Sequence, residues 1–158
     1  MNATMRTMLI VDDEKGVRDT LRFLLERKGY KVVVAGDGRE AVTLAAQQPI
    51  DGAMIDVHMP VMNGIEACRA LHAQAAQAGR TLAVWMMSGA PTVQAVEAAE
   101  KAGALALLGK PFDLTALLKR FEEHFNATGG VPGGSGVAKR PSESFGFCPV
   151  RPPGQSGL

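Results

Sequence analysis

The sequence predicts an α/β protein in which a parallel sheet is covered by helices on both faces. Three observations predict it. Five short apolar runs alternate with five helical patterns over the first 126 residues. The runs are almost continuously apolar, as expected for strands that are buried on both faces. Turn residues separate the elements. We expect strands at 8–11, 31–35, 52–55, 82–87 and 104–108, and helices at 17–28, 40–48, 65–78, 93–102 and 114–125.

The first two strand–helix units have clear boundaries. The apolar run 8–11 ends in acidic residues, and Val17, Leu21 and Leu24 then recur at helical spacing until Gly29 ends the helix. The β-branched run 31–35 is followed by a Gly-Asp-Gly turn. The second helix ends before Pro49.

The last three units follow the same pattern. The short run 52–55 and the longer run 82–87 are strand-sized and apolar, and each precedes a helical segment. Gly103 ends the fourth helix. The fifth helix has the strongest amphipathic stripe. Its members are Leu114, Leu117, Leu118, Phe121 and Phe125.

Composition excludes several classes of protein. The 158 residues carry a formal net charge of +1, which gives neither a basic footprint for nucleic acid nor a polybasic membrane anchor. No apolar run approaches the ~20 residues of a membrane span, and the start of the chain lacks the apolar core of a secretory signal. Cys68 and Cys148 are far apart and have no partner motif. This argues against a disulfide scaffold or zinc site and fits a reducing cytoplasm.

Composition also divides the chain. Residues 129–158 contain eight glycines and five prolines, which is typical of a flexible tail or linker. We therefore expect a globular domain over residues 1–126 and a flexible tail over 127–158. Phe145, Phe147 and Cys148 are the tail residues that could anchor it to the domain.

Polar side chains follow four of the expected strands where each apolar run ends. They are Asp12, Asp13, Asp56, Ser88 and Lys110. Because reactive groups gather at the carboxyl ends of parallel strands, we expect these side chains to share one patch. Each also has a plain structural explanation. The acidic pair and the serine could cap helices, Asp56 could be a loop acid, and the lysine could be solvated.

The chemistry of the patch suggests phosphoryl transfer. Clustered carboxylates raise one another's pKa values unless a cation joins them, and a few oxygen ligands suit Mg²⁺. An ammonium and a hydroxyl can stabilise the charge on a transferring phosphoryl group. A carboxylate can be the nucleophile. Asp56 is the best candidate because it stands alone at its strand end, while Asp12 and Asp13 form a pair suited to the metal.

These residues carry a resemblance to the receiver domain of two-component response regulators. The resemblance covers about residues 6–125. It rests on residues 9–14 (LIVDDE), 36–41 (GDGREA), 55–64 (IDVHMPVMNG), 87–89 (MSG) and 103–112 (GALALLGKPF). Five motifs in order, at expected strand ends, are far more specific than one acidic pair. The resemblance implies a flavodoxin-like (βα)5 fold with strand order 2-1-3-4-5.

The resemblance also implies roles for the patch. Asp56 would accept a phosphoryl group from a phosphohistidine on a sensor kinase. Asp12 and Asp13 would hold Mg²⁺ with Asp56, helped by the backbone carbonyl of His58. The phosphoryl oxygens would contact Ser88 and Lys110. Such a domain is a signalling module of the bacterial cytoplasm and no enzyme beyond its own phosphorylation and dephosphorylation.

The partners follow from the same resemblance. They are a sensor histidine kinase or phosphotransfer protein and a downstream protein target, with no direct binding to nucleic acid or membrane. A homodimer could form through the face of the fourth helix, fifth strand and fifth helix.

One position departs from the family pattern. The family commonly has Tyr or Phe three residues before the lysine, as a rotameric switch coupled to the serine, and this chain has Leu107. A second hypothesis is therefore a constitutive interaction module with little phosphorylation-dependent switching. A third is a Mg²⁺-dependent phosphatase with an aspartyl nucleophile. Such enzymes generally need an acid two residues after the nucleophile, where this chain has His58.

Overall fold

The sheet of the computed structural model is parallel and has the predicted strand order. The structure describes residues 6–59, 62–110, 113–129 and 146–148. The strand order is β2-β1-β3-β4-β5-β6, and every neighbouring pair is parallel. The strands are β1 (Thr7–Val11), β2 (Lys31–Ala35), β3 (Gly52–Asp56), β4 (Ala83–Ser88), β5 (Ala106–Gly109) and β6 (Gly146–Cys148). The order 2-1-3-4-5 is confirmed, and β6 is an addition that the sequence did not predict.

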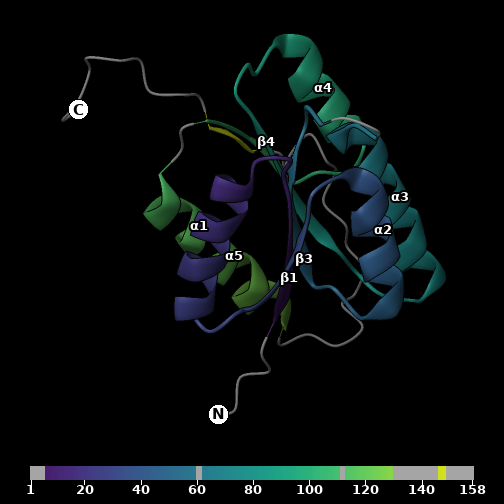
Figure 1. Ribbon diagram of the computed structural model, residues 1–158, viewed down its shortest axis with the longest axis vertical. Helices are drawn as coiled ribbons and strands as arrows, with labels where there is room; N and C mark the ends of the chain where they lie inside the picture. Colours follow the sequence, from purple (N-terminus) through teal and green to yellow (C-terminus); the bar gives the residue numbers. More distant parts are fainter. Residues whose placement is uncertain (1–5, 60–61, 111–112, 130–145, 149–158) are drawn as a thin grey trace.

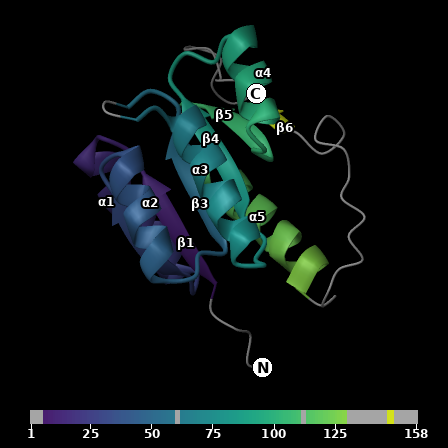
Figure 2. The same cartoon turned by 90° about the vertical axis from the view of Figure 1, so that its right-hand side faces the viewer.

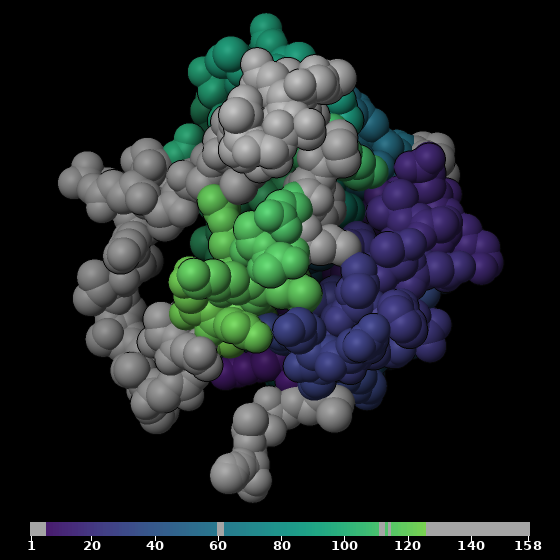
Figure 3. All heavy atoms as spheres, turned by 90° about the vertical axis from the view of Figure 1, so that its left-hand side faces the viewer, coloured from purple at the N-terminus to yellow at the C-terminus, as the bar shows by residue number. Residues whose placement is uncertain are grey.

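Helices cover both faces of the sheet. They are α1 (Lys15–Arg27), α2 (Gly38–Gln47), α3 (Gly64–Gln77), α4 (Val93–Lys101) and α5 (Leu114–Gly129). Figure 1 shows α1 and α5 on one face and α2, α3 and α4 on the other. α1 and α5 lie side by side in Figure 3, where α5 is green and α1 is blue-purple. Among the described residues, no helix is long and apolar enough to cross a bilayer.

The strands alternate their side chains between two cores, one under each helical layer. Leu9, Ile55 and Met86 belong to the core beneath α2, α3 and α4. Ile10, Trp85 and Phe121 belong to the core beneath α1 and α5. Because both faces are covered, β3 and β4 are buried along their whole length. The two helical layers hold the sheet between them and so fix the positions of the strand ends that carry the polar residues.

Side-chain caps set the starts of four helices, and at α5 the Asp113 carboxylate accepts from the amides of Thr115 and Ala116. Asp37, Asn63 and Thr92 each accept a hydrogen bond from the backbone amide three residues later. Asn63 and Glu66 form a reciprocal capping box at the start of α3. Gly103, with φ +100°, follows α4 as predicted from its position. Most predicted boundaries agree with the structure to within two residues.

The C-terminal region differs from the prediction in two respects. α5 runs on to Gly129, beyond the expected end of the domain. Residues 146–148 form a strand on the sheet rather than part of a flexible tail. The reason is that the edge of β5 can pair with any extended segment, whatever the composition around that segment. The other residues of the expected tail beyond Gly129 lie outside the described residues.

Candidate functional site

Four strands deliver polar residues to one edge of the sheet. Asp12 follows β1, Asp56 ends β3, Ser88 ends β4 and Lys110 follows β5. The parallel register aligns these ends, since Val11 pairs with Ile55 and Ser88 with Gly109. The observed pairing therefore brings the four residues to the same edge of the sheet.

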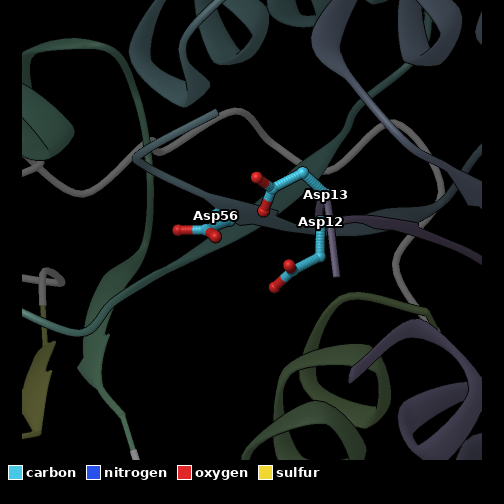
Figure 4. A group of neighbouring side chains, drawn as sticks. All are labelled: Asp12, Asp13 and Asp56. Carbon is cyan, nitrogen blue, oxygen red and sulfur yellow. The ribbon is translucent and has the colours of Figure 1, made fainter. Parts of the chain in front are cut away.

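Three carboxylates gather at this edge. Asp12, Asp13 and Asp56 each contribute an oxygen, and these atoms lie within 4.8 Å of one another. Figure 4 shows the three side chains together at the ends of β1 and β3. Asp12 is fully buried and Asp56 is only 6% exposed, whereas Asp13 is exposed to solvent. The cluster is thus buried on one side and open on the other.

Lys110 binds the two buried carboxylates. Its Nζ donates to Asp12 Oδ2 at 2.9 Å and to Asp56 Oδ2 at 3.3 Å. Its backbone amide donates to the Ser88 carbonyl oxygen at 2.8 Å, which fixes the chain where it leaves β5. Among the described residues, Asp13 makes no hydrogen bond through its carboxylate. One ammonium faces three carboxylates, so a divalent cation would balance the charge of this group.

Backbone amides orient both buried carboxylates. The His58 amide donates to Asp56 Oδ1 at 3.2 Å, and the Glu14 amide donates to Asp12 Oδ1 at 2.9 Å. A carboxylate has about four acceptor positions, so each keeps free lone pairs after these bonds. The acids are therefore held in place and still able to ligate a cation.

Electrostatics distinguish Asp56 from an ordinary surface acid. Burial raises the pKa of Asp56, and the charge of Asp12 raises it further, while Lys110 and the His58 amide oppose both effects. Burial lowers the pKa of Lys110, but its hydrogen bond to Asp12 and the charges of Asp56 and Asp12 outweigh this and raise it. The lysine thus stays charged, and keeping the buried Asp56 carboxylate charged costs free energy.

Because the charged Asp56 carboxylate lowers the stability of the folded protein, Asp56→Asn should raise the melting temperature in metal-free buffer, by an amount that depends on pH. The pKa of Asp56 is higher in the folded protein than its ordinary value of 3.8. The protonated side chain is therefore tolerated in the fold at pH values below 3.8, and stability is lost as the pH rises through the raised pKa and the carboxylate becomes charged. At neutral pH the variant should therefore unfold at a higher temperature, by on the order of 3 °C. The gain should shrink as the pH falls towards 3.8. Thermal unfolding followed by circular dichroism, with a chelator present, measures both effects.

Asp19→Asn is the matched control. Asp19 lies on α1, is exposed and pairs with Lys15 at 2.6 Å. Its replacement should leave the melting temperature nearly unchanged at neutral pH. Equal melting temperatures for wild type and Asp56→Asn at every pH would contradict the electrostatic assignment.

Three further predicted residues have different surroundings. The Ser88 hydroxyl is buried and accepts a hydrogen bond from the Ala90 amide at 3.0 Å, so its proton remains available for donation. Leu107 is fully buried in the core beneath α2, α3 and α4. The His58 side chain is exposed, and its amide is the part that contacts Asp56. The roles of Ser88 and of the His58 carbonyl stay predictions, and Leu107 fills its part of the core as an ordinary apolar residue.

Two residues that support the site were not found from the sequence. Arg18 Nη1 on α1 donates to the Asp12 carbonyl oxygen at 2.7 Å and steadies the acidic loop. Gly64 packs directly on the backbone of Asp56, where an added Cβ would overlap the carbonyl oxygen. Arg18 carries no sequence signal for this contact. Gly64 directly follows a capping asparagine, which indicates a helix start but not a close approach.

Comparison with known proteins points to one family. The model of the response regulator receiver domain matches residues 8–122. The response regulator MprA of Mycolicibacterium vanbaalenii is 40% identical over 113 residues, which are 72% of this chain and 47% of that protein. The sensory/regulatory protein RpfC of Xanthomonas campestris pv. campestris is 35% identical over 111 residues, or 70% of this chain and 15% of that protein. The chain thus spans half or less of these relatives.

Solved structures agree with this. The chemotaxis protein CheY4 of Vibrio cholerae is 33% identical, with a TM-score of 0.69 over 76% of this chain and 98% of that one. The CheX–CheY–BeF3–Mg²⁺ complex of Borrelia burgdorferi matches at 28% identity and a TM-score of 0.68, covering 76% of this chain and 89% of that one.

Proposed function

The chain belongs to the response regulator receiver family, and from that premise we propose that Asp56 accepts a phosphoryl group from a phosphohistidine. The observation that supports it best is the buried Asp12–Asp56–Lys110 arrangement, with Asp13 open to solvent beside it. A carboxylate in this position is oriented by protein groups, and solvent reaches it from the side on which a donor would arrive. The protein is a signalling domain, so this transfer serves regulation rather than turnover.

We propose Mg²⁺ as the cofactor. The carboxylates of Asp12, Asp13 and Asp56 would hold it, with the His58 carbonyl as a further oxygen ligand, and hard oxygen donors of this number suit that ion. The ion would supply positive charge to the phosphoryl oxygens. The fit rests on the charge of the group, because Lys110 alone does not neutralise three acids.

The chain's own residues account for the transfer. An Asp56 oxygen forms the new bond to phosphorus as the phosphorus–nitrogen bond to the donor imidazole breaks, and that nitrogen keeps the bonding electron pair. The Lys110 ammonium lies beside the Asp56 carboxylate, where it can stabilise the negative charge that develops on the phosphoryl oxygens during transfer. The Ser88 hydroxyl can donate a hydrogen bond to one of these oxygens. Water then attacks the phosphorus, the bond between phosphorus and the Asp56 oxygen breaks, and the carboxylate is restored with release of inorganic phosphate.

The proposed partners follow from the family. A sensor histidine kinase or a phosphotransfer protein supplies the phosphoryl group, and a downstream protein reads the phosphorylated state through contacts. We propose that this takes place in the cytoplasm. The face of α4, β5 and α5 is the proposed contact surface for a target or for a second copy.

Labelling by a small phosphodonor tests the proposal. The protein is incubated with acetyl phosphate with and without Mg²⁺, and the adduct is located by peptide mapping. We expect one acid-stable, base-labile adduct on Asp56 that requires Mg²⁺. Rapid multiple turnover of varied phosphomonoesters would instead support an aspartyl phosphatase.

One observation favours a second candidate function. Leu107 is fully buried at the position where the family commonly has a switching aromatic residue. A constitutive interaction module would follow if the fold is intact and no adduct forms. An adduct that leaves the hydrogen exchange of α4 and β5 unchanged would show phosphorylation without switching.

A further inference from the structure

The outer edge of β5 is occupied by a segment of the same chain. Ala106, Leu107 and Leu108 pair in parallel with Gly146, Phe147 and Cys148. Figure 2 shows β6 beyond β5, at the end of the sheet and near α4. The segment therefore occupies the one edge of the sheet that lies between α4 and α5.

This edge is chemically suited to receive an extended peptide. The outermost strand of a sheet presents a row of backbone amides and carbonyls that need partners. Partner proteins use such edges by adding a strand, and main-chain hydrogen bonds then supply the affinity. β2 is the opposite edge, so β5 is the edge available beside α4 and α5.

The chain itself can supply this strand without a second copy. Parallel neighbours need a crossover connection, and α5 followed by residues 130–145 lies between β5 and β6 in the sequence. A tethered segment competes at a high effective concentration with a free one. Among the residues that the structure describes, its pairing covers Gly146–Cys148, and Pro149 follows directly in the sequence and has no amide to continue the ladder.

We propose that Gly146–Cys148 is a displaceable strand that occupies the β5 edge in cis, and that a protein partner gains this edge by adding its own short extended segment once β6 leaves. A strand of three residues is short enough to leave without unfolding the sheet, because segments with few contacts open first. The docking role rests on the proposed signalling function, whereas the occupancy of the edge does not.

Hydrogen exchange on the full chain, without phosphodonor, tests the occupancy. The double variant Gly146→Pro/Phe147→Pro removes two consecutive amides, and one of them must face β5 because alternate residues of a strand do. Consecutive amides of β5 face β4 and β6 in turn, so we expect whichever of Leu107 and Leu108 faces β6 to exchange at least tenfold faster in this variant, while the other keeps its protection by β4. The matched control, Val150→Pro/Arg151→Pro, adds two prolines beyond β6 and should exchange like wild type. Unchanged exchange in β1 and β3 shows that the double variant is folded.

A peptide in trans tests the docking role. A labelled peptide of residues 141–150 that carries Cys148→Ser should bind the double variant saturably and restore β5 protection. Wild type should bind it at least tenfold more weakly, because β6 occupies the edge. Three results would overturn the proposal: equal β5 exchange in wild type and double variant, no difference in peptide binding, or a concentration-dependent dimer by sedimentation whose formation protects β5. Failure of Asp56 to label affects none of these measurements.

Discussion

Replacing Asp56 by asparagine is expected to abolish labelling by acetyl phosphate in the presence of Mg²⁺. The change removes the nucleophilic oxygen but keeps the side-chain size and an acceptor for the His58 amide. Lys110 retains its stronger contact, the 2.9 Å bond to Asp12. Because the buried charge of Asp56 costs stability, the variant should be at least as stable as wild type, and the loss of labelling should appear without unfolding. Intact-mass spectrometry after a fixed incubation measures the adduct.

Asp19→Asn, made in parallel, should label at the wild-type rate. It removes one carboxylate from an exposed helical position where Asp19 pairs only with Lys15. A full-strength adduct on Asp56→Asn would show that another carboxylate of the cluster is the acceptor, and peptide mapping would then identify Asp12 or Asp13.

Gly64→Ala is expected to lower the free energy of unfolding by about 2–3 kcal/mol, the cost of forcing an extra methyl into a packed site. The new Cβ would overlap the Asp56 carbonyl oxygen and lie 2.8 Å from both the Asp56 carbonyl carbon and Val57 Cα. These are backbone atoms and cannot rotate away, and the Gly64 amide is itself bonded to the Val57 carbonyl oxygen at 2.9 Å. The end of β3 must therefore move. Urea unfolding followed by Trp85 fluorescence measures the loss.

Gly16→Ala provides the matched control. Gly16 lies in α1 with nothing within 4 Å of the added methyl, so alanine should be neutral or stabilise the helix by up to ~1 kcal/mol. Because the Gly64 variant displaces the backbone of Asp56, the proposed acceptor, its labelling by acetyl phosphate should also slow. Equal urea midpoints for both variants and wild type would show that the backbone around Asp56 can accommodate the added methyl group at position 64 without loss of stability.

The strand ends illustrate how far the sequence alone leads. Asp12, Asp56 and Lys110 were expected at one edge because each directly ends or follows an apolar run, and parallel pairing brings such ends together. The alternation of strands and helices likewise predicted five parallel strands, and the structure confirms the strand order that the resemblance to receiver domains implied. The strands, the helices and the polar residues at the strand ends can be predicted because apolar runs and helical periodicity are visible in the sequence itself.

Features that depend on distant segments were not predicted. The contact of Arg18 with the Asp12 carbonyl depends on how α1 lies on the sheet. The tight packing of Gly64 depends on how α3 approaches β3.

What the sequence by itself determined is the order of elements and the kind of chemistry at the strand ends, since both follow from periodicity and residue type. Only the tertiary structure decided which carboxylates Lys110 contacts, that Asp13 alone of the three faces solvent, and that β6 covers the edge of β5. The physical reason is that hydrogen-bond partners and burial are set by the distances between separate segments, and local propensity contains no information on those distances.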